Sequence, residues 1–291
     1  REFIPSQWLA HVEVWKSLLK NLKIHALIRN LANLSQDNIL GPANWDVVNY
    51  VVETLRNGTL LKTSRVHPLE LLIAARVYGG GRIQQPRGLK EWEVVSQVVD
   101  ALDDGVYESI PNVDPTHKQY FIAIDASGSM QSPFGPAPGF SCREAAVALA
   151  MILQKVEPHT LTLGFTEGDH IKVIPISPKQ RLNDAMRTFQ EMIKPQGTDI
   201  SLPFQYAIKN GMGTDVFVIL TDSETWAGKQ HPQQAFDEYR NKYNRKAKCV
   251  IVSMAANNVT VGDPNDAGVL QAVGFDASLM QVMRQFVMGE F

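Results

Sequence analysis

The stretch Tyr120-Phe-Ile-Ala-Ile-Asp-Ala-Ser-Gly-Ser-Met130 decides the fold class of this chain. Its first residues are apolar and are typical of a buried strand. Asp125, Ser127 and Ser129 follow at alternate positions where that strand ends. One carboxylate and two hydroxyls spaced in this way can converge on one point, and hard oxygen ligands suit a hard divalent cation such as Mg²⁺. The stretch therefore predicts a metal site at the end of a buried strand.

Two later segments carry further oxygen ligands. Thr198 follows a Pro-Gln-Gly turn, and Asp222 follows the apolar run Val216-Phe-Val-Ile-Leu-Thr221. Ligands of an open parallel sheet bind outside the carboxyl ends of its strands, so Asp125 and Asp222 both occupy positions that this rule favours. We therefore expect three segments to meet in one crevice.

A DxSxS motif followed by a distant Thr and a distant strand-end Asp is the pattern of the metal-ion-dependent adhesion site (MIDAS) of von Willebrand factor A domains. The chain resembles that family over residues 119–291. The resemblance implies a bound Mg²⁺, or alternatively Mn²⁺. The residues alone leave another interpretation open, in which the serines cap the following helix and the aspartates are ordinary turn residues. The metal shell implied by the resemblance is Asp125, Ser127, Ser129, Thr198 and Asp222, with Asp199 beside it in a second layer.

Composition limits the class of protein. The 291 residues, of which 44% are apolar, allow one or two domains with a sizeable core. Only Cys142 and Cys249 are present, which argues against a disulfide framework or a structural zinc site and favours a reducing, cytoplasmic compartment. Neither a membrane-spanning apolar run nor a signal peptide is predicted. Because the first helical pattern has no preceding unit to pack against, we expect the chain to be a fragment.

The first part of the chain, residues 1–114, is predicted to be a helical domain. Its apolar residues recur at helical spacing, and paired helices with short joints are typical of HEAT-like repeats. His67 is expected to begin a helix because Pro68 follows it. Four tryptophans on helical spacing are predicted to be core residues rather than base-stacking platforms, namely Trp8, Trp15, Trp45 and Trp92. The expected helices cover residues 6–21, 23–34, 44–57, 67–79 and 90–108.

The second part, residues 115–291, is predicted to be a mostly parallel α/β sheet with helices on both faces, because short apolar strands alternate with amphipathic helices. Segment 131–140 contains three prolines and two glycines and is expected to form an exposed loop. The expected strands cover residues 119–125, 160–166, 171–175, 215–221 and 248–254. The expected helices cover residues 141–156, 180–193, 201–210, 231–244 and 279–288.

The combination of both parts narrows the family. The segments Ala26-Leu-Ile-Arg-Asn-Leu31 and Arg65-Val-His-Pro-Leu-Glu-Leu-Leu-Ile-Ala74, followed by Thr221-Asp-Ser-Glu-Thr-Trp-Ala-Gly228 and Asp263-Pro-Asn-Asp-Ala-Gly268, resemble the carboxyl half of Ro 60 kDa and bacterial Ro-related proteins of the TROVE family. The resemblance implies a ribonucleoprotein component that binds small noncoding Y RNAs and takes part in RNA quality control. It also implies an A domain that docks a partner. Most of the family's helical ring is missing here, which leaves RNA binding by this chain in doubt.

The charge pattern agrees weakly with RNA binding. Residues 1–90 carry twelve Lys and Arg against six Asp and Glu, whereas residues 91–114 carry seven acids and no Lys or Arg. Basic side chains of the first part could neutralise phosphates and give binding that depends on salt, although solvated helix faces have the same composition. The candidate RNA contacts are Lys16, Lys20, Lys23, Arg29, Lys62 and Arg65.

Three functional classes are compatible with the metal pattern. The favoured one is a noncatalytic RNA-associated module whose metal accepts an acidic group from a partner protein or other ligand. A metal-dependent phosphohydrolase is the first alternative, but the chain has no phosphate-binding GxxxxGK[ST] loop, and Glu224 is the sole evident general base near the shell. The second alternative is an extracellular adhesion A domain. The basic helical part argues against it.

Overall fold

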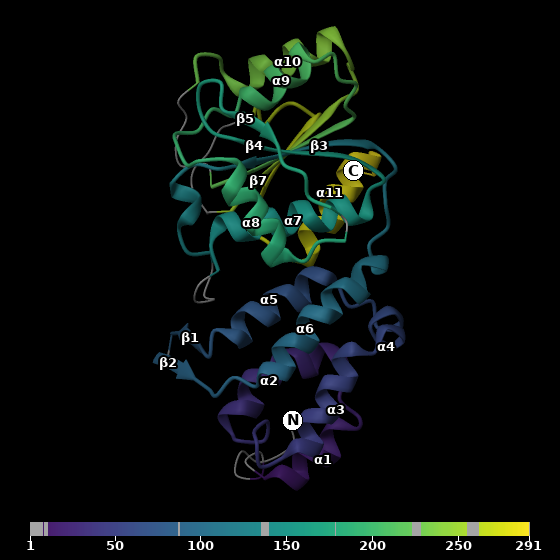
Figure 1. Cartoon of the computed structure of the whole chain (residues 1–291). Coiled ribbons are helices and arrows are strands. Elements are labelled where there is room, and N and C mark those ends of the chain that lie inside the picture. Colours follow the sequence, from purple (N-terminus) through teal and green to yellow (C-terminus); the bar gives the residue numbers. More distant parts are fainter. Residues whose placement is uncertain are drawn as a thin grey trace. The chain divides into compact units, whose positions relative to one another are not determined.

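The structure is a computed structural model that describes residues 8, 11–86, 88–134, 140–177, 179–222, 228–254 and 262–290. The chain divides into two compact units, of which the first ends at Val113 and the second begins at Asp114. The boundary that we expect from the sequence lies one residue later. Figure 1 shows that the first unit is helical and that the second is built around a sheet. No helix of the described residues is long and apolar enough to cross a membrane.

The first unit consists of helices that pack through their apolar faces. Helix α6 lies against α3, α4 and α5, and α2 lies against α5. A Cβ atom on Gly105 of α6 would lie 3.0 Å from the carbonyl oxygen of Leu55, so glycine permits the close approach of α6 to α3. The helices are α1 (Val12–Leu19), α2 (Ile24–Gln36), α3 (Trp45–Arg56), α4 (Gly58–Thr63), α5 (Pro68–Gly79) and α6 (Ser96–Ser109).

His67 begins a helix as predicted. It is the N-cap of α5, and its Nδ1 atom accepts a hydrogen bond of 3.2 Å from the Leu69 N–H. Pro68 occupies the first helical position, where its missing N–H costs nothing and its fixed φ suits the helix. The prediction for His67 is therefore confirmed.

Two tryptophan predictions are wrong. Trp15 and Trp92 are buried, but Trp8 and Trp45 are about half exposed, at 50% and 49%. Trp45 is the first residue of α3, and the buried stripe of that helix begins two residues later at Val47. Helical periodicity therefore places the Trp45 ring on a face that the rest of this unit does not cover.

A small hairpin replaces the expected start of the last helix. Strands β1 (Arg82–Gln85) and β2 (Gly88–Glu91) pair antiparallel, so α6 begins at Ser96 rather than at residue 90. Gly88 has a φ of +122°, which only glycine adopts readily. Most hairpin residues are exposed, and the segment therefore lacks the alternating apolar pattern by which strands are recognised. Helix α4 was also not expected from the sequence, and the beginning of the helix predicted at residue 6 lies outside the described residues.

The second unit has a six-stranded sheet in the order β5-β4-β3-β6-β7-β8. Its neighbouring strands are parallel except for β4 and β5, which are antiparallel. The predicted α/β class with a mostly parallel sheet is therefore confirmed. The strands are β3 (Gln119–Asp125), β4 (His159–Phe165), β5 (Ile171–Val173), β6 (Val216–Thr221), β7 (Lys248–Ser253) and β8 (Val269–Val273).

Helices cover both faces of this sheet, as Figure 1 shows. Helices α9 and α10 lie on one face, where Phe204, Phe236 and Tyr239 pack against Phe121 and Phe217 of the strands. Helices α7, α8 and α11 lie on the other face. All five agree with the predicted helices within a few residues. They are α7 (Cys142–Val156), α8 (Leu182–Met192), α9 (Leu202–Lys209), α10 (Pro232–Lys242) and α11 (Ala277–Met288).

Two expectations for the second unit need correction. Strand β8 was not predicted, because it is short, half exposed and lies at the sheet edge. Segment 131–140 was expected to be exposed, and Gln131, Ser132 and Pro133 are exposed. Phe140 departs from this expectation, because it is 2% exposed and packs edge-on against Phe134 and Phe275 with ring centroids 5.6 and 5.9 Å away. Aromatic burial here outweighs the turn-forming composition. Residues 135–139 lie outside the described residues.

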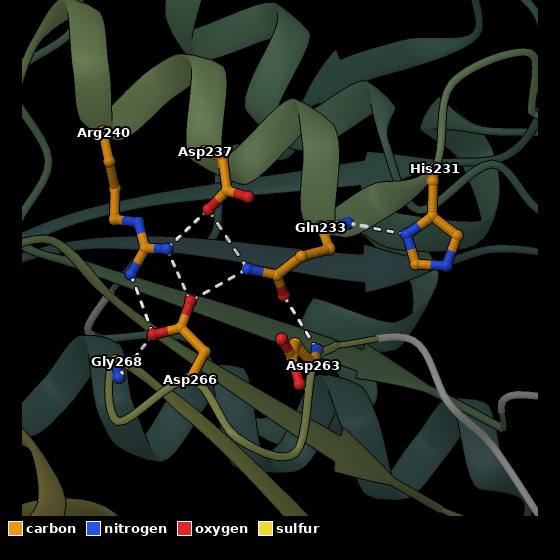
Figure 2. A network of polar contacts seen from close by, with 7 residues as sticks. All are labelled: His231, Gln233, Asp237, Arg240, Asp263, Asp266 and Gly268. Atoms are coloured by element: carbon orange, nitrogen blue, oxygen red, sulfur yellow. Dashed lines mark hydrogen bonds and ion pairs between the residues drawn. The ribbon is translucent and has the colours of Figure 1, made fainter.

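A polar network holds the segment before β8 against α10 (Figure 2). Arg240 donates from Nη1 to Asp266 Oδ1 at 3.0 Å, and its Nη2 pairs with the other oxygen of the same carboxylate. The Gly268 N–H also donates to Asp266, at 2.8 Å. Gln233 extends the network by accepting the Asp263 N–H at 2.9 Å. The motif that begins at Asp263 thus serves to fasten the connection between β7 and β8.

Candidate metal centre

The candidate site lies where the strand order of the sheet reverses. The chain runs from β3 outward through β4 to β5, and then returns to place β6 on the other side of β3. Ligands of doubly wound sheets bind at this point, outside the carboxyl ends of the strands. Asp125 is the last residue of β3, and Asp222 directly follows β6. The fold therefore places both carboxylates at the expected edge.

Asp125 is fully buried and is the centre of the site. Its Oδ1 atom accepts the Ser127 N–H at 2.8 Å, and its Oδ2 atom accepts the Thr221 hydroxyl at 2.7 Å. The Thr198 hydroxyl lies 3.3 and 3.5 Å from the two carboxylate oxygens. Three separate segments of the chain thus supply polar groups to one carboxylate.

The two serines of the motif lie together and do not cap a helix. Ser127 Oγ lies 3.1 Å from Ser129 Oγ. Helix α7 is capped by Ser141, whose hydroxyl accepts the Glu144 N–H, and the short 3₁₀ helix that begins at Ser129 has no side-chain cap. The capping alternative for these serines is therefore wrong. Their hydroxyls stay available for another ligand.

Thr198 and Asp199 have different surroundings. Thr198 is fully buried and reaches the Asp125 carboxylate. Asp199 instead accepts hydrogen bonds from the Ser201 N–H and hydroxyl, at 2.9 and 2.6 Å, just before α9. These contacts give Asp199 a role in shaping the start of α9. The second-layer role stays a prediction.

Thr221 belongs to the site, since its hydroxyl donates to Asp125, and it is not among the site residues predicted from the sequence. The parallel register pairs Ile124 with Leu220, so Asp125 and Thr221 are the next neighbours across the two strands. That register is the signal that could have identified Thr221. A threonine directly before a strand-end aspartate has no distinctive pattern of its own.

The electrostatics of this oxygen cluster favours a bound cation. Burial raises the pKa of Asp125 to about 6, and the nearby negative charge of Asp222 adds to this rise. Hydrogen bonds from Thr221 and Ser127 oppose it in part. Asp222 is itself 1% exposed. A divalent cation would neutralise two buried carboxylates at once, which proton uptake by one of them cannot do.

The donor set fits Mg²⁺ or Mn²⁺ better than zinc. Carboxylate and hydroxyl oxygens suit hard cations, whereas zinc prefers Cys and His. Within the described ranges, no three residues among His, Cys, Asp and Glu gather in a way that could hold a metal. Three of the five predicted ligands are hydroxyls, namely those of Ser127, Ser129 and Thr198. Hydrogen-bond contacts bring Asp125, Ser127, Ser129 and Thr198 together, and the charge of Asp222 acts on Asp125.

Five of the six candidate RNA contacts are exposed, namely Lys20, Lys23, Arg29, Lys62 and Arg65. Lys16 is the exception, because it pairs with Glu13 and Asp46 at 3.0 Å each. These ion pairs raise the pKa of Lys16, and its ammonium group is less available to a phosphate because two carboxylates already neutralise it. Lys16 is therefore the weakest of the candidates.

His25 places two of these arginines at one junction of the helical unit. Its Nδ1 atom lies 2.9 Å from Glu70 Oε2, and its Nε2 atom lies 3.0 Å from the Ser64 carbonyl. Both partners are acceptors, so the ring donates from both nitrogens, and the Glu70 hydrogen bond raises the pKa of His25. Arg29 lies one helical turn beyond His25, and Arg65 directly follows Ser64. Arg29 and Arg65 thus stand in sequence next to residues of one hydrogen-bonded junction.

The second unit is a doubly wound sheet with a DxSxS loop at its switch point, a threonine from a second loop and an aspartate after the neighbouring strand. These features define a von Willebrand factor A domain. Residues 119–287 match the family model of the Ro60 vWA domain, and residues 1–79 match the TROVE domain model. The chain therefore belongs to the Ro60 vWA domain family, with part of a TROVE domain before it. This confirms the resemblance stated from the sequence.

Relatives match along nearly the whole chain. The RNA-binding protein RO60 of Deinococcus radiodurans is 37% identical over 290 residues, covering 99% of this chain and 54% of that protein. The protein of the same description from Caenorhabditis elegans is 34% identical over 292 residues, covering 100% of this chain and 44% of that protein. The crystal structure of the D. radiodurans RO (RSR) protein superposes with a TM-score of 0.87 at 36% identity, covering 96% of this chain and 56% of that one. The chain thus spans about half the length of the curated relatives it matches.

Proposed function

We propose that this chain is part of a noncatalytic, RNA-binding ribonucleoprotein component. Its helical unit contacts RNA phosphates, and its A domain holds Mg²⁺ or Mn²⁺ and docks an acidic group of a partner. The observation that carries the proposal is the match of both units, in order, to relatives described as RNA-binding proteins. The RNA that it binds is a small noncoding RNA of the Y type, and the cellular process that it serves is RNA quality control.

The exposed arginines beside His25 support the RNA part of the proposal. Arg29 and Arg65 are exposed and stand in sequence next to the junction in which His25 joins Glu70 and the Ser64 carbonyl; since Glu70 offsets any charge on His25, the two arginines carry the positive charge available to a phosphate. Such a surface binds phosphates without reading sequence, so the affinity of this chain falls steeply with salt. A few helices cannot enclose an RNA strand. Binding by this chain is therefore weaker than binding by a longer relative.

The donor set supports the docking part. Two carboxylates and three hydroxyls leave room for water and for one carboxylate from outside. Gly128 is exposed and Ser129 is half-buried, so solvent reaches the site from the side of this loop. When bound, the cation supplies an open coordination position for an acidic group. Asp125, Ser127, Ser129, Thr198 and Asp222 would hold it.

The surroundings of the site favour docking over hydrolysis. Among the described residues, the hydrogen-bond partners of Asp125 are a backbone N–H and hydroxyls, none of which is a general base at neutral pH. Glu224, the general base considered from the sequence, lies outside the described residues. We therefore propose a noncatalytic role for the protein. We also place it in the cytoplasm, because its two free cysteines are buried thiols that need no oxidising compartment.

A gel shift tests the RNA part. The chain is mixed with a structured RNA and with the same RNA bearing a single-stranded 3′ tail, at low and at physiological salt. Arg29→Glu combined with Arg65→Glu is expected to weaken binding at least tenfold at low salt, because two phosphate contacts become repulsive. Lys16→Gln is the matched control and should change little, since its charge is already paired. Tight, salt-insensitive binding by residues 115–291 alone would contradict the assignment of RNA to the helical unit.

A further inference from the structure

Arg143 is buried beside the candidate metal loop. It is the second residue of α7 and is only 6% exposed. Its Nη2 atom donates to the carbonyl oxygens of Ala126 and Ser127, at 3.2 and 2.8 Å. These are the backbone carbonyls that directly follow the first candidate ligand, Asp125. The guanidinium therefore binds the backbone of the DxSxS loop rather than a side chain.

A buried guanidinium at the position of Arg143 is unfavourable in free energy when it is considered by itself. A cation in the first turn of a helix faces the positive end of the helix dipole. Burial adds a desolvation cost, which lowers the pKa of the guanidinium, although the charge of Asp125 opposes this shift. Its Nε atom is buried without a hydrogen-bond partner, and the described residues include no carboxylate within ion-pair distance. Ordinary helix stability therefore does not explain an arginine here.

The two carbonyl contacts explain it. Consecutive carbonyl groups that point to one guanidinium must lie on the same side of the loop. The Ser127 N–H meanwhile donates to Asp125, and the Gly128 N–H donates to the Gln196 carbonyl at 3.3 Å. The loop is thus held by Arg143 through its carbonyls and by Asp125 and Gln196 through its amides. Both amide contacts lead toward the segments that carry the candidate ligands.

We propose that Arg143 is a positioning residue that holds the DxSxS loop in its metal-binding shape before the metal arrives. The inference rests on the proposed metal site. The positive charge of Arg143 also acts on the Asp125 carboxylate. Loss of the two carbonyl contacts would free the loop, so metal binding would have to order it first.

The test uses Arg143→Met, which keeps an unbranched apolar side chain but cannot donate, and Arg143→Lys, which keeps the charge but loses the fork of donors. Arg187→Met is the matched control, because Arg187 is exposed on α8 and its ion pair among the described residues is with Asp184 of the same helix. Mn²⁺ affinity is measured by calorimetry. Amide hydrogen exchange of Ser127 and Gly128 is measured in EDTA, where no metal contributes.

We expect Arg143→Met to weaken Mn²⁺ binding at least tenfold and to speed exchange of both amides, with Arg143→Lys between it and the wild type. Saturating Mn²⁺ should restore the amide protection in both variants, which loss of the fold would not allow. Wild-type affinity and exchange in Arg143→Lys and Arg143→Met would overturn the inference. Failure of the wild-type protein to bind Mn²⁺ would instead overturn the proposed metal site, and exchange in EDTA would still show whether Arg143 holds the loop.

Discussion

Thr221 donates its hydroxyl to Asp125 Oδ2 at 2.7 Å from the neighbouring parallel strand. The two residues are 96 positions apart in the sequence, and both side chains are fully buried. A hydrogen bond to a buried carboxylate favours its charged form and fixes its orientation. Thr221 therefore leaves the other carboxylate oxygen, Oδ1, to the Ser127 N–H, while the Thr198 hydroxyl lies near both oxygens.

Replacing Thr221 by Val should weaken metal binding without unfolding the domain. The lost hydrogen bond to a charged group is worth about 2 kcal/mol, which corresponds to roughly thirtyfold in affinity if it acts wholly on the metal-bound state. Calorimetry with Mn²⁺ at pH 7.5 measures the change. Thr162→Val is the matched control, because the Thr162 hydroxyl is buried on β4 without a hydrogen-bond partner. Equal affinities for the two variants would show that Thr221 does not support the site.

Asp125→Ala should abolish Mg²⁺ and Mn²⁺ binding, because it removes the carboxylate on which the other polar groups converge. The fold should survive both this change and metal removal, since the sheet core is apolar and does not include the site. Circular dichroism with and without EDTA checks the fold. Loss of most helical signal on chelation would mean that the metal is structural. Unchanged metal affinity in Asp125→Ala would refute the ligand assignment.

Stability in EDTA should fall as the pH rises from about 4 to 6. The pKa of Asp125 is raised to about 6 in the native state by burial, so the native protein binds more protons than the unfolded chain in this window. Stability decreases with pH wherever the native state holds the extra proton, here by roughly 3 kcal/mol. Above pH 6 the carboxylate is ionised and ready for a cation. Mg²⁺ should therefore raise the melting temperature more at pH 7.5 than at pH 5.

Asp125→Asn provides the control for this pH dependence, because it keeps the shape of the side chain but does not titrate. The difference in melting temperature between wild type and Asp125→Asn should change across pH 4 to 6 in EDTA and stay constant above it. An equal effect of Mg²⁺ on the wild type at pH 5 and pH 7.5 would contradict the link between Asp125 ionisation and metal binding.

Asp266→Ala should destabilise the second unit by about 2 kcal/mol, because it removes the two-point partner of the partly buried Arg240 guanidinium and leaves Asp237 as its remaining ion pair (Figure 2). The Asp266 charge and its hydrogen bonds raise the pKa of Arg240, which indicates a favourable pair. Urea unfolding measures the change. Asp184→Ala breaks an exposed pair with Arg187 and should cost less than about 1 kcal/mol. A similar small loss in both variants would show that the network does not fasten the segment before β8.

Local pattern was enough to predict most elements of the second unit. Strand β3 was expected over residues 119–125 and is observed there. A short, continuous apolar run between polar ends is typical of a buried strand, so the local sequence was sufficient to predict it. The exposed hairpin around Gly88 and the edge strand β8 were missed for the opposite reason. Exposed strands gain their stability from pairing with a neighbouring strand, and their own sequence shows no apolar pattern that would predict this pairing.

The sequence by itself determined that Asp125, Ser127 and Ser129 follow one strand and that Asp222 follows another, since strand ends are local features. Only the tertiary structure decided which polar groups surround Asp125. Thr221 reaches it because β6 pairs with β3 in parallel register, and Arg143 reaches the following carbonyls because α7 packs beneath that strand. Contacts of this kind depend on strand order and on packing between distant segments, and the residues that make them carry no local pattern that distinguishes them from other buried residues.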